Sequence, residues 1–407
     1  MEESKIRAWW AHRQGLDGSL AAKPDADKPA AGKSAAGLLQ QAGWARSVGG
    51  CSPYLTLFSR AGIPREKTDS DVAKLNIHEL PSARGCTYVL PAADFALGLA
   101  LGEGFCGETR TAEKLGVTRK EIDKLRDAVI AALEKGPLDP DGLREATGKA
   151  VRNLGPEGQK KGLTTTLPVA LGELQSSGDI RRIPINGRLD QQRYKYTLWK
   201  PNPRRDFKMS LDQAYTELAR RFFTWIGPAT VAEFQGFAGI GVKAAKTAVE
   251  PLKLESIGSG DDRVMLPGDR AKLEAFKPPK DPYYSLIGSI DSIALLHRPG
   301  LKALLDPKDL ARGGFEGKAG KPLGGLSDLP NHAILDRGRL VGLWEYDIVT
   351  SSIAWVAFVK KDKALQDAIA RTEQYVTDQL GDARSFSLDS PKSRAPKIEA
   401  LRNAAGK

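Results

Sequence analysis

The clearest alternation of apolar and polar positions lies within residues 118–148. Apolar side chains recur there at steps of three and four, the spacing of one helix face: Ile122, Leu125, Val129 and Leu133. Thr118 and Glu121 have the spacing of a capping box at the start of this helix, and Gly136-Pro137 ends it. A second, shorter helix is predicted at about 140–148.

A third helix and a β-hairpin follow. Thr166 can cap the helix and Gly178 stops it. Two strand-like runs come next, at about 179–185 and 191–199, with Asn186-Gly187 close to the predicted tip. Three helices followed by a hairpin predict a winged helix-turn-helix unit.

A second unit of this kind is predicted at 210–267. Ser210 caps a long amphipathic helix, and Gly227-Pro228 breaks it. A short helix then leads through Gly239-Ile240-Gly241 into another helix, and residues 252–266 can form a small hairpin.

The flanking regions carry weaker signals. In the N-terminal part we expect a strand at 86–90 and helices at 3–16, 35–47, 69–77 and 91–101. In the C-terminal part we expect a helix at 363–380, a partly frayed polar tail from residue 385, and strands within 283–296, 334–347 and 353–359. Residues 18–34 and 312–331, which offer little to bury, predict mobile loops.

These elements predict an α+β fold of tandem winged helix-turn-helix units followed by a C-terminal β-rich (α/β) domain. A length of 407 residues suggests several domains. We expect the first winged-helix unit at 1–110, the second with its basic wing at 111–205, the third at 206–278, and the β-rich domain at 279–407.

The positive charge is concentrated in one segment. The chain has a net charge of +11, and residues 149–208 hold 13 Lys/Arg against 5 Asp/Glu. Most of the surplus therefore coincides with the predicted hairpin, which favours a surface for nucleic-acid phosphates. A solvated face that binds nothing is the alternative.

The expected partner is double-stranded DNA, including alkylated DNA. Asn186, Gln191 and Gln192 suit base edges in a groove. Thr164, Thr165 and Thr166 at a helix start can donate to phosphates, and Lys243 and Lys246 can reach them from the third unit. The basic side chains expected to contact phosphates in the second unit are Lys160, Lys161, Arg181, Arg182, Arg188, Arg193 and Lys195, with Arg204 and Arg205 extending the track.

Several catalytic motifs are excluded. Gly32-Lys33-Ser34 lacks the earlier glycine of a phosphate-binding loop, since Asp27 stands there. The four histidines show no metal-binding spacing, and no serine-hydrolase elbow occurs, so neither a metal nor a cofactor is expected. Gly239-Ile240-Gly241 before Lys243 fits a helix-hairpin-helix phosphate site, but the turn before a recognition helix is the simpler interpretation.

The expected location is the cytoplasm, in a bacterial cytosol or nucleoid. The N-terminal segment lacks the basic region, apolar core and cleavage site of a signal peptide. No apolar run approaches the roughly 20 residues that cross a bilayer, and the three cysteines form no CxxC pair.

Four segments together resemble the helix-turn-helix superfamily that includes the AlkZ-like (YcaQ-like) DNA glycosylases. These segments are Ile6–Leu16, Ala83–Asp94, Gly227–Thr230 with Phe234–Gly239, and Leu335–Trp344. The resemblance spans nearly the whole chain and rests on the order of the segments. It implies tandem winged helices and a β-rich domain arranged as a concave DNA clamp.

The resemblance also implies where the chemistry takes place. Members carry Gln-x-Gln, or a Gln-x-Asp variant, after the second helix of the first unit, where this chain has Ala45-Arg46-Ser47. Loss of a base builds positive charge on the sugar, so an amide or carboxylate must hold the attacking water. The remaining candidates for this role are Gln40, Gln41, Ser47 and Arg84.

Three functions fit these observations. A base-excision glycosylase, or a lesion-binding relative, would prefer alkylated or distorted duplex. A winged-helix transcription regulator would recognise a defined site, about 10³-fold or more over random DNA. A non-catalytic DNA-binding clamp would do neither. Several different winged units in one chain favour the first.

Overall fold

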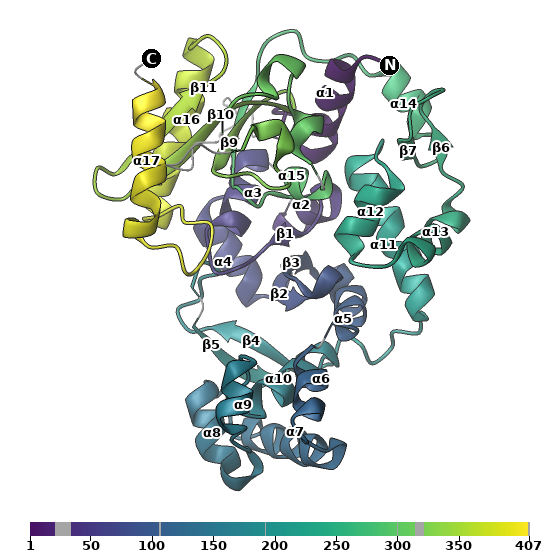
Figure 1. Ribbon diagram of the computed structural model, residues 1–407, viewed down its shortest axis with the longest axis vertical. Coiled ribbons are helices and arrows are strands. Elements are labelled where there is room, and N and C mark those ends of the chain that lie inside the picture. Colours follow the sequence, from purple (N-terminus) through teal and green to yellow (C-terminus); the bar gives the residue numbers. More distant parts are fainter. Residues whose placement is uncertain (21–33, 106, 192, 299, 314–320, 406–407) are drawn as a thin grey trace.

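The computed structural model describes residues 1–20, 34–105, 107–191, 193–298, 300–313 and 321–405. It contains three groups of helices that each end in a small antiparallel sheet, and a C-terminal four-stranded sheet flanked by helices (Figure 1). The predicted α+β class, with tandem winged units before a β-rich domain, is confirmed. Most of the predicted loop at 18–34, and the part of the second loop at 314–320, lie outside the described residues.

The first unit packs three helices against a three-stranded sheet of order β1-β3-β2. Its elements are α2 (Ala35–Ala42), β1 (Ala45–Arg46), α3 (Ser52–Ala61), α4 (Arg65–Ala73), β2 (Ile77–Pro81) and β3 (Thr87–Pro91), followed by α5 (Phe95–Glu103).

Two helix predictions in this unit are wrong. The helix expected over 35–47 ends at Ala42, because Gly43 takes a φ of 98° that stops it and the chain continues as β1. The helix expected at 69–77 instead spans Arg65–Ala73, since Ile77 already belongs to β2. The helix α3 lies in a stretch where none was predicted, and it begins with a proline in its first turn.

The second unit contains the three predicted helices and the hairpin, together with two helices that were not predicted. Its elements are α6 (Gly107–Lys114), α7 (Arg119–Leu133), α8 (Pro140–Thr147), α9 (Gly155–Lys160), α10 (Leu167–Ser176), β4 (Ile180–Pro184) and β5 (Tyr194–Leu198). The two helices that were not predicted are α6 and α9. The capping box is present: the Thr118 N–H donates to Glu121 Oε2 at 2.7 Å, and the Glu121 N–H donates to Thr118 Oγ1 at 3.3 Å. The unit has its own core, built around Leu125, Val129 and Leu174.

The third unit consists of three helices followed by a short hairpin. These are α11 (Leu211–Ile226), α12 (Val231–Ala238), α13 (Val242–Val249), β6 (Glu255–Ser256) and β7 (Val264–Met265). Ser210 and Gln213 form a capping box at the start of α11. In contrast to the second unit, this unit shares a continuous core with the first unit and the C-terminal domain.

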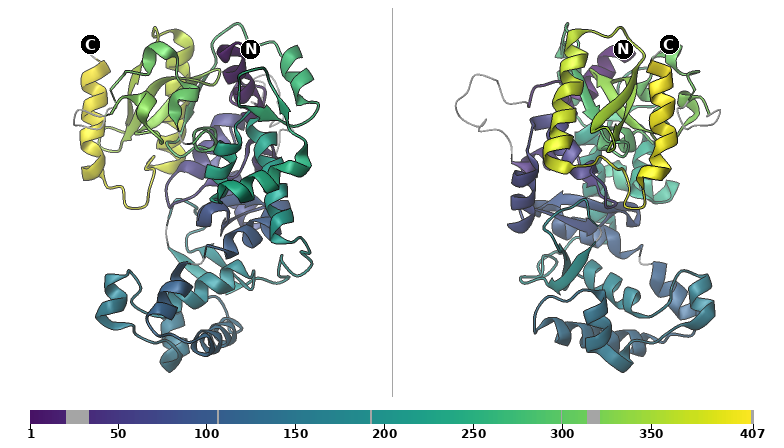
Figure 2. Two further views of the ribbon diagram at one scale, coloured as in Figure 1. Left: turned by 45° about the vertical axis from the view of Figure 1, so that its right-hand side comes forward. Right: turned by 90° about the vertical axis from the view of Figure 1, so that its left-hand side faces the viewer.

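The C-terminal domain is an antiparallel sheet of order β11-β10-β9-β8. The helix α14 (Asp269–Ala275) precedes it in the chain. The elements of the domain are β8 (Tyr284–Ile287), α15 (Ser292–Leu296), β9 (His332–Asp336), β10 (Arg339–Asp347), β11 (Ser352–Ala357), α16 (Lys363–Tyr375) and α17 (Pro391–Ala405). Figure 2 shows α16 and α17 on opposite faces of this sheet. The tail expected to fray is helical instead, because Ile398 and Leu401 are buried. Only the first part of the strand expected within 283–296 forms, as β8. Asp291 then caps α15, so the rest of this segment is helical.

The N-terminal helix α1 (Glu3–Gln14) joins the first and third units. Trp9 Nε1 donates to the carbonyl of Gly227 at 2.8 Å, and Trp10 Nε1 donates to that of Pro228 at 3.0 Å. Gln14 donates to the carbonyl of Trp225 at 3.0 Å. These donors satisfy carbonyls at and just beyond the end of α11, which lack partners within that helix.

A fully buried ion pair lies where α1, α3 and α15 meet. Arg60 donates to both carboxylate oxygens of Asp291, at 2.6 and 2.8 Å, and both side chains are inaccessible to solvent. The same guanidinium donates to Gln14 Oε1 and to Ser292 Oγ, each at 3.0 Å. The pair therefore connects the N-terminal helix, the first unit and the C-terminal domain.

Among the described residues, no helix combines the length and the apolar character needed to cross a membrane.

Removal of one partner of the buried Arg60–Asp291 ion pair should be strongly destabilising. Asp291→Ala leaves the Arg60 charge buried and uncompensated, so we expect the free energy of unfolding to fall by about 3–5 kcal/mol. Urea denaturation followed by circular dichroism measures this change. The control is Arg144→Ala, which removes an exposed pair with Asp141 and should cost less than about 1 kcal/mol. Equal effects of the two substitutions would contradict the importance of the buried pair.

Candidate nucleic-acid interface and active site

The basic hairpin of β4 and β5 is docked against other parts of the molecule. It lies between the helices of the second unit and the first unit (Figure 1). In its connecting loop Leu189 is fully buried, and its N–H donates to the Tyr54 hydroxyl of α3 at 2.9 Å. Arg384 donates to the carbonyl of Asp190 at 2.9 Å, so the C-terminal domain also holds this loop.

The two faces of the hairpin have different environments. Arg181 pairs with Thr197 and Ile183 with Lys195, so these residues share one face. On the other face Arg182 stacks over the Tyr194 ring, 4.5 Å from its centroid. The first face leaves Lys195 exposed. On the second face Arg182 reaches the first unit, whereas Ile180, Tyr196 and Leu198 pack against the core of the second unit.

Arg182 reaches a carboxylate of the first unit. Its Nη2 lies 3.4 Å from Glu79 Oε2 on strand β2. Burial opposes the charge of Arg182, but Glu79 and the neighbouring tyrosines outweigh it and raise the pKa of this guanidinium. Burial and the charge of Glu79 likewise raise the pKa of Tyr194.

Glu79 also binds the strand that carries residues 45–47. The Ser47 hydroxyl donates to Glu79 Oε1 at 2.5 Å, and both side chains are buried. Oε2, the second carboxylate oxygen, makes no hydrogen bond to any described residue. Ser47 and Glu79 therefore form a buried hydroxyl–carboxylate pair beneath the Arg182 side of the hairpin.

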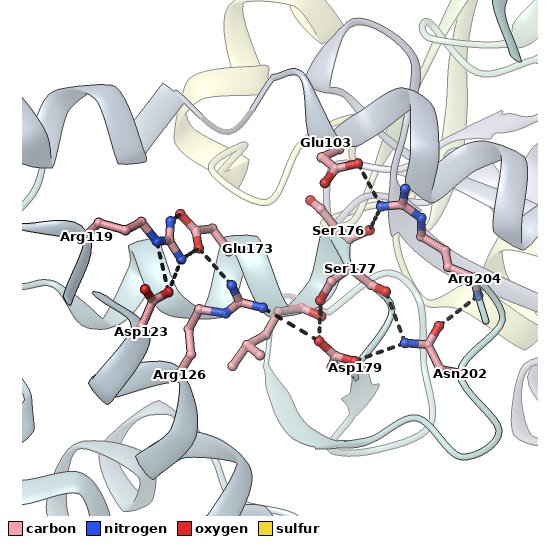
Figure 3. A network of polar contacts seen from close by, with 11 residues as sticks. Glu103, Arg119, Asp123, Arg126, Glu173, Ser176, Ser177, Asp179, Asn202 and Arg204 are labelled. Atoms are coloured by element: carbon pink, nitrogen blue, oxygen red, sulfur yellow. Dashed lines mark hydrogen bonds and ion pairs between the residues drawn. The ribbon is translucent and has the colours of Figure 1, made fainter. Parts of the chain in front are cut away.

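A polar network sets the orientation of the second unit (Figure 3). Arg119 on α7 makes two 2.8 Å hydrogen bonds to Glu173 on α10. After the hairpin, Arg204 donates to the carbonyl of Ser176 at 3.0 Å and pairs with Glu103 of α5 at 2.9 Å. Arg204, expected to extend the phosphate track, thus ties the second unit to α5.

The predicted DNA contacts fall into exposed and engaged groups. The exposed cations are Lys160, Lys161, Arg193, Lys195, Arg205, Lys243 and Lys246. Lys160 is paired with Glu157 at 2.7 Å, and Arg181 is half-buried. Arg188 pairs with Asp190 and donates to the carbonyl of Leu380 at 2.9 Å, so it helps to dock the hairpin.

The polar residues predicted to contact DNA also differ in their exposure. Asn186 and Thr164 are exposed, and Gln191 and Thr165 are partly buried. Thr166 is buried, and its hydroxyl accepts the backbone N–H of Arg152 at 3.0 Å. Gln192 lies outside the described residues.

Lys243 and Lys246 belong to a different part of the molecule from the hairpin. Both lie on the exposed side of α13, beside the exposed Val242. The preceding turn packs closely on the first unit, since a Cβ atom at Gly239 would lie 2.9 Å from the Cα of Arg84. Arg84, one of the candidate catalytic residues, therefore sits at the contact between the first and third units.

The two glutamines proposed for catalysis lie on α2. Gln40 has an exposed side chain, and its backbone carbonyl accepts Trp225 Nε1 at 2.8 Å. Gln41 donates to the carbonyl of Arg13 at 3.4 Å, toward the N-terminal helix. Ser47, another of the candidates, donates to a carboxylate, that of Glu79. Over the described residues, no set of three or more His, Cys, Asp or Glu side chains could hold a metal ion.

Sequence reasoning missed Glu79 altogether. It is separated by 32 residues from Ser47, and it lies in a five-residue strand that carried no motif. Cross-strand pairing alone brings the two together, because Val89 on β3 faces both Ala45 and Glu79. No local signal in the sequence could have indicated this contact.

Comparison with known proteins gives a family and a fold. A family model described as "DNA glycosylase AlkZ-like" matches residues 36–375. Among solved structures, the chain is similar to the DNA glycosylase AlkZ of Streptomyces sahachiroi, with a TM-score of 0.65 and 19% sequence identity. This similarity covers 95% of this chain and 98% of that one, so the two share a fold. A search of curated protein sequences found no match.

A buried histidine beside the hairpin should make stability depend on pH. Burial, helped by the charges of Arg181 and Arg182, lowers the pKa of His78 from 6.5 to about 3. Its neutral form is thus favoured in the folded state, and stability is lost as the pH falls below 6.5. We expect wild type to lose about 2 kcal/mol more than His78→Gln between pH 7 and pH 5. Urea denaturation at both pH values measures this difference, and equal losses would contradict the assignment.

Proposed function

This chain belongs to the AlkZ-like DNA glycosylase family, and we propose that it is a DNA repair enzyme that removes an alkylated, positively charged base from duplex DNA. The observation that carries this proposal is the family match over residues 36–375. DNA as the ligand follows from the family, whereas the duplex and the alkylated base are the finer parts of the proposal.

The exposed face of the hairpin supports duplex binding. Arg193 and Lys195 are exposed there, next to the exposed tip residue Asn186. Among the ion pairs between described residues, neither cation has a carboxylate partner, so both are available to phosphates. Lys243 and Lys246 offer a second set of contacts on α13.

The chemistry suits a protein without a strong acid at the site. A base alkylated on a ring nitrogen already carries a positive charge, so it leaves without being protonated. Water attacks the sugar carbon C1′, the C1′–N bond breaks, and its electron pair neutralises the departing base. The protein must therefore hold water, accept its proton and stabilise positive charge on the sugar.

Release of free base tests the activity directly. A duplex carrying one 7-methylguanine, incubated with excess protein, should yield free 7-methylguanine and an alkali-labile abasic site. Chromatography of the released base and gel analysis of the cleaved strand measure the two products. An undamaged duplex of the same sequence is the control and should stay intact. Tight binding without release would contradict the enzymatic proposal and leave a DNA-binding clamp.

The hairpin cations should control the salt dependence of binding. The double substitution Arg193→Ala with Lys195→Ala should weaken binding on all sequences and reduce the slope of log K against log salt by about 2, because each lost phosphate contact removes about 0.9. Fluorescence anisotropy at salt concentrations from about 50 to about 300 mM measures the slope. Lys363→Ala with Arg371→Ala, on exposed positions of α16, is the matched control and should leave the slope unchanged. An identical slope for both double variants would exclude the hairpin face as the interface.

A further inference from the structure

The carboxylate of Glu79 is held in an unusual state for a buried group. It is only 5% exposed; the Ser47 hydroxyl donates to Oε1, and a side-chain hydrogen bond with Glu79 also contributes to the raised pKa of Tyr194. Oε2 forms an ion pair with Arg182 Nη2 at 3.4 Å, but it accepts no well-directed hydrogen bond from the described residues. A buried charged oxygen without a hydrogen bond is costly, and such groups in native proteins call for an explanation.

From this geometry we infer that Glu79 is the catalytic residue that binds the attacking water and accepts its proton, and that Ser47 is its positioning residue. The inference rests on the proposed function. It names the group that performs the hydrolysis, and it places that group on strand β2 instead of on β1.

The sheet of the first unit explains how Glu79 reaches this position. Ala45 and Glu79 both face Val89, one from each side, so all three side chains share one face of the sheet. Ser47, two residues beyond Ala45 in the chain, lies on that face as well. The small side chains of Ala45 and Ser47 leave room for the longer glutamate to lean toward β1, where the Ser47 hydroxyl fixes one of its oxygens.

The free oxygen is suited to the reaction. Oε2 can accept one proton of a bound water as the water oxygen attacks C1′, and the glutamic acid so formed returns that proton to solvent. Until the proton is transferred, the carboxylate carries a negative charge. This charge lies beside the positive charge that builds on the sugar, and it stabilises the transition state there. The Ser47 hydrogen bond keeps the other oxygen occupied, so Oε2 is the one presented to water.

Arg182 covers this carboxylate from the side of the hairpin. Its guanidinium lies over Oε2, stacks on Tyr194, and is 21% exposed at its outer side. For water to reach Oε2 the Arg182 side chain must move aside, because its guanidinium is the group that covers this oxygen.

The decisive experiment measures single-turnover release of 7-methylguanine from duplex at saturating protein. Glu79→Gln keeps the shape of the side chain but removes its charge and its ability to accept a proton, so the rate should fall by at least about 100-fold. Its DNA affinity, measured by anisotropy, should stay within about threefold of wild type, since Glu79 is buried away from phosphates. Glu345→Gln is the matched control: Glu345 is equally buried, accepts one hydrogen bond from Asn331, and lies in the C-terminal sheet. It should leave the rate unchanged.

Variants of Ser47 test the positioning role separately and keep the inference testable if Glu79→Gln is unstable. Ser47→Ala should lower the single-turnover rate by about tenfold, whereas Ser47→Thr, which keeps the hydroxyl, should restore it. Thermal melting of each variant shows whether it is folded. Equal rates for Ser47→Ala and wild type would overturn the role of Ser47.

The possible results separate the inference from the function on which it rests. If wild type releases base and Glu79→Gln releases it at a similar rate, the role of Glu79 is overturned and the proposed function stands. If wild type releases no base, the proposed function fails and the inference fails with it. If Glu79→Gln loses the activity of wild type while keeping its affinity and its fold, and Glu345→Gln does not, the inference is supported.

Discussion

The buried ion pair between Arg60 and Asp291 is the interaction on which the placement of the other parts depends. It joins α3 of the first unit to the start of α15, and Gln14 brings the N-terminal helix to the same point. Through α1, whose tryptophans bind the end of α11, the third unit is held as well. Buried charges tolerate few alternative arrangements, because each must stay paired, so the pair specifies how these parts meet.

The second unit is organised differently. It has a separate core, and it projects from the remainder of the molecule in both views of Figure 2. Its contacts are the docked hairpin loop at Leu189 and the polar network around Glu173 and Arg204. This arrangement brings Arg182 of the hairpin to the first unit and leaves Lys195, on the opposite face, exposed, since neighbouring residues of a strand point to opposite faces.

Much of the fold could be predicted because its signals are local. The capping boxes at Thr118 and Ser210 and the glycine stop at Gly178 act within a few residues, and the structure shows each of them. The failures also have physical causes. The helix expected over 35–47 ended early at Gly43, and the tail became α17 because the sheet offered an apolar surface for Ile398 and Leu401. Whether a marginal segment folds depends on what it packs against, which periodicity does not reveal.

The candidate site divides in the same way. The sequence alone determined the family resemblance, the concentration of charge and the hairpin, since each is a property of residues close together in the chain. It pointed to Ala45-Arg46-Ser47 as the place of chemistry, but it offered no partner for Ser47. Only the tertiary structure decided that Glu79 stands across the sheet, that Arg182 covers it, and that Arg188 docks the loop. These contacts depend on strand register and on packing between units, and such long-range choices leave no periodic trace along the chain.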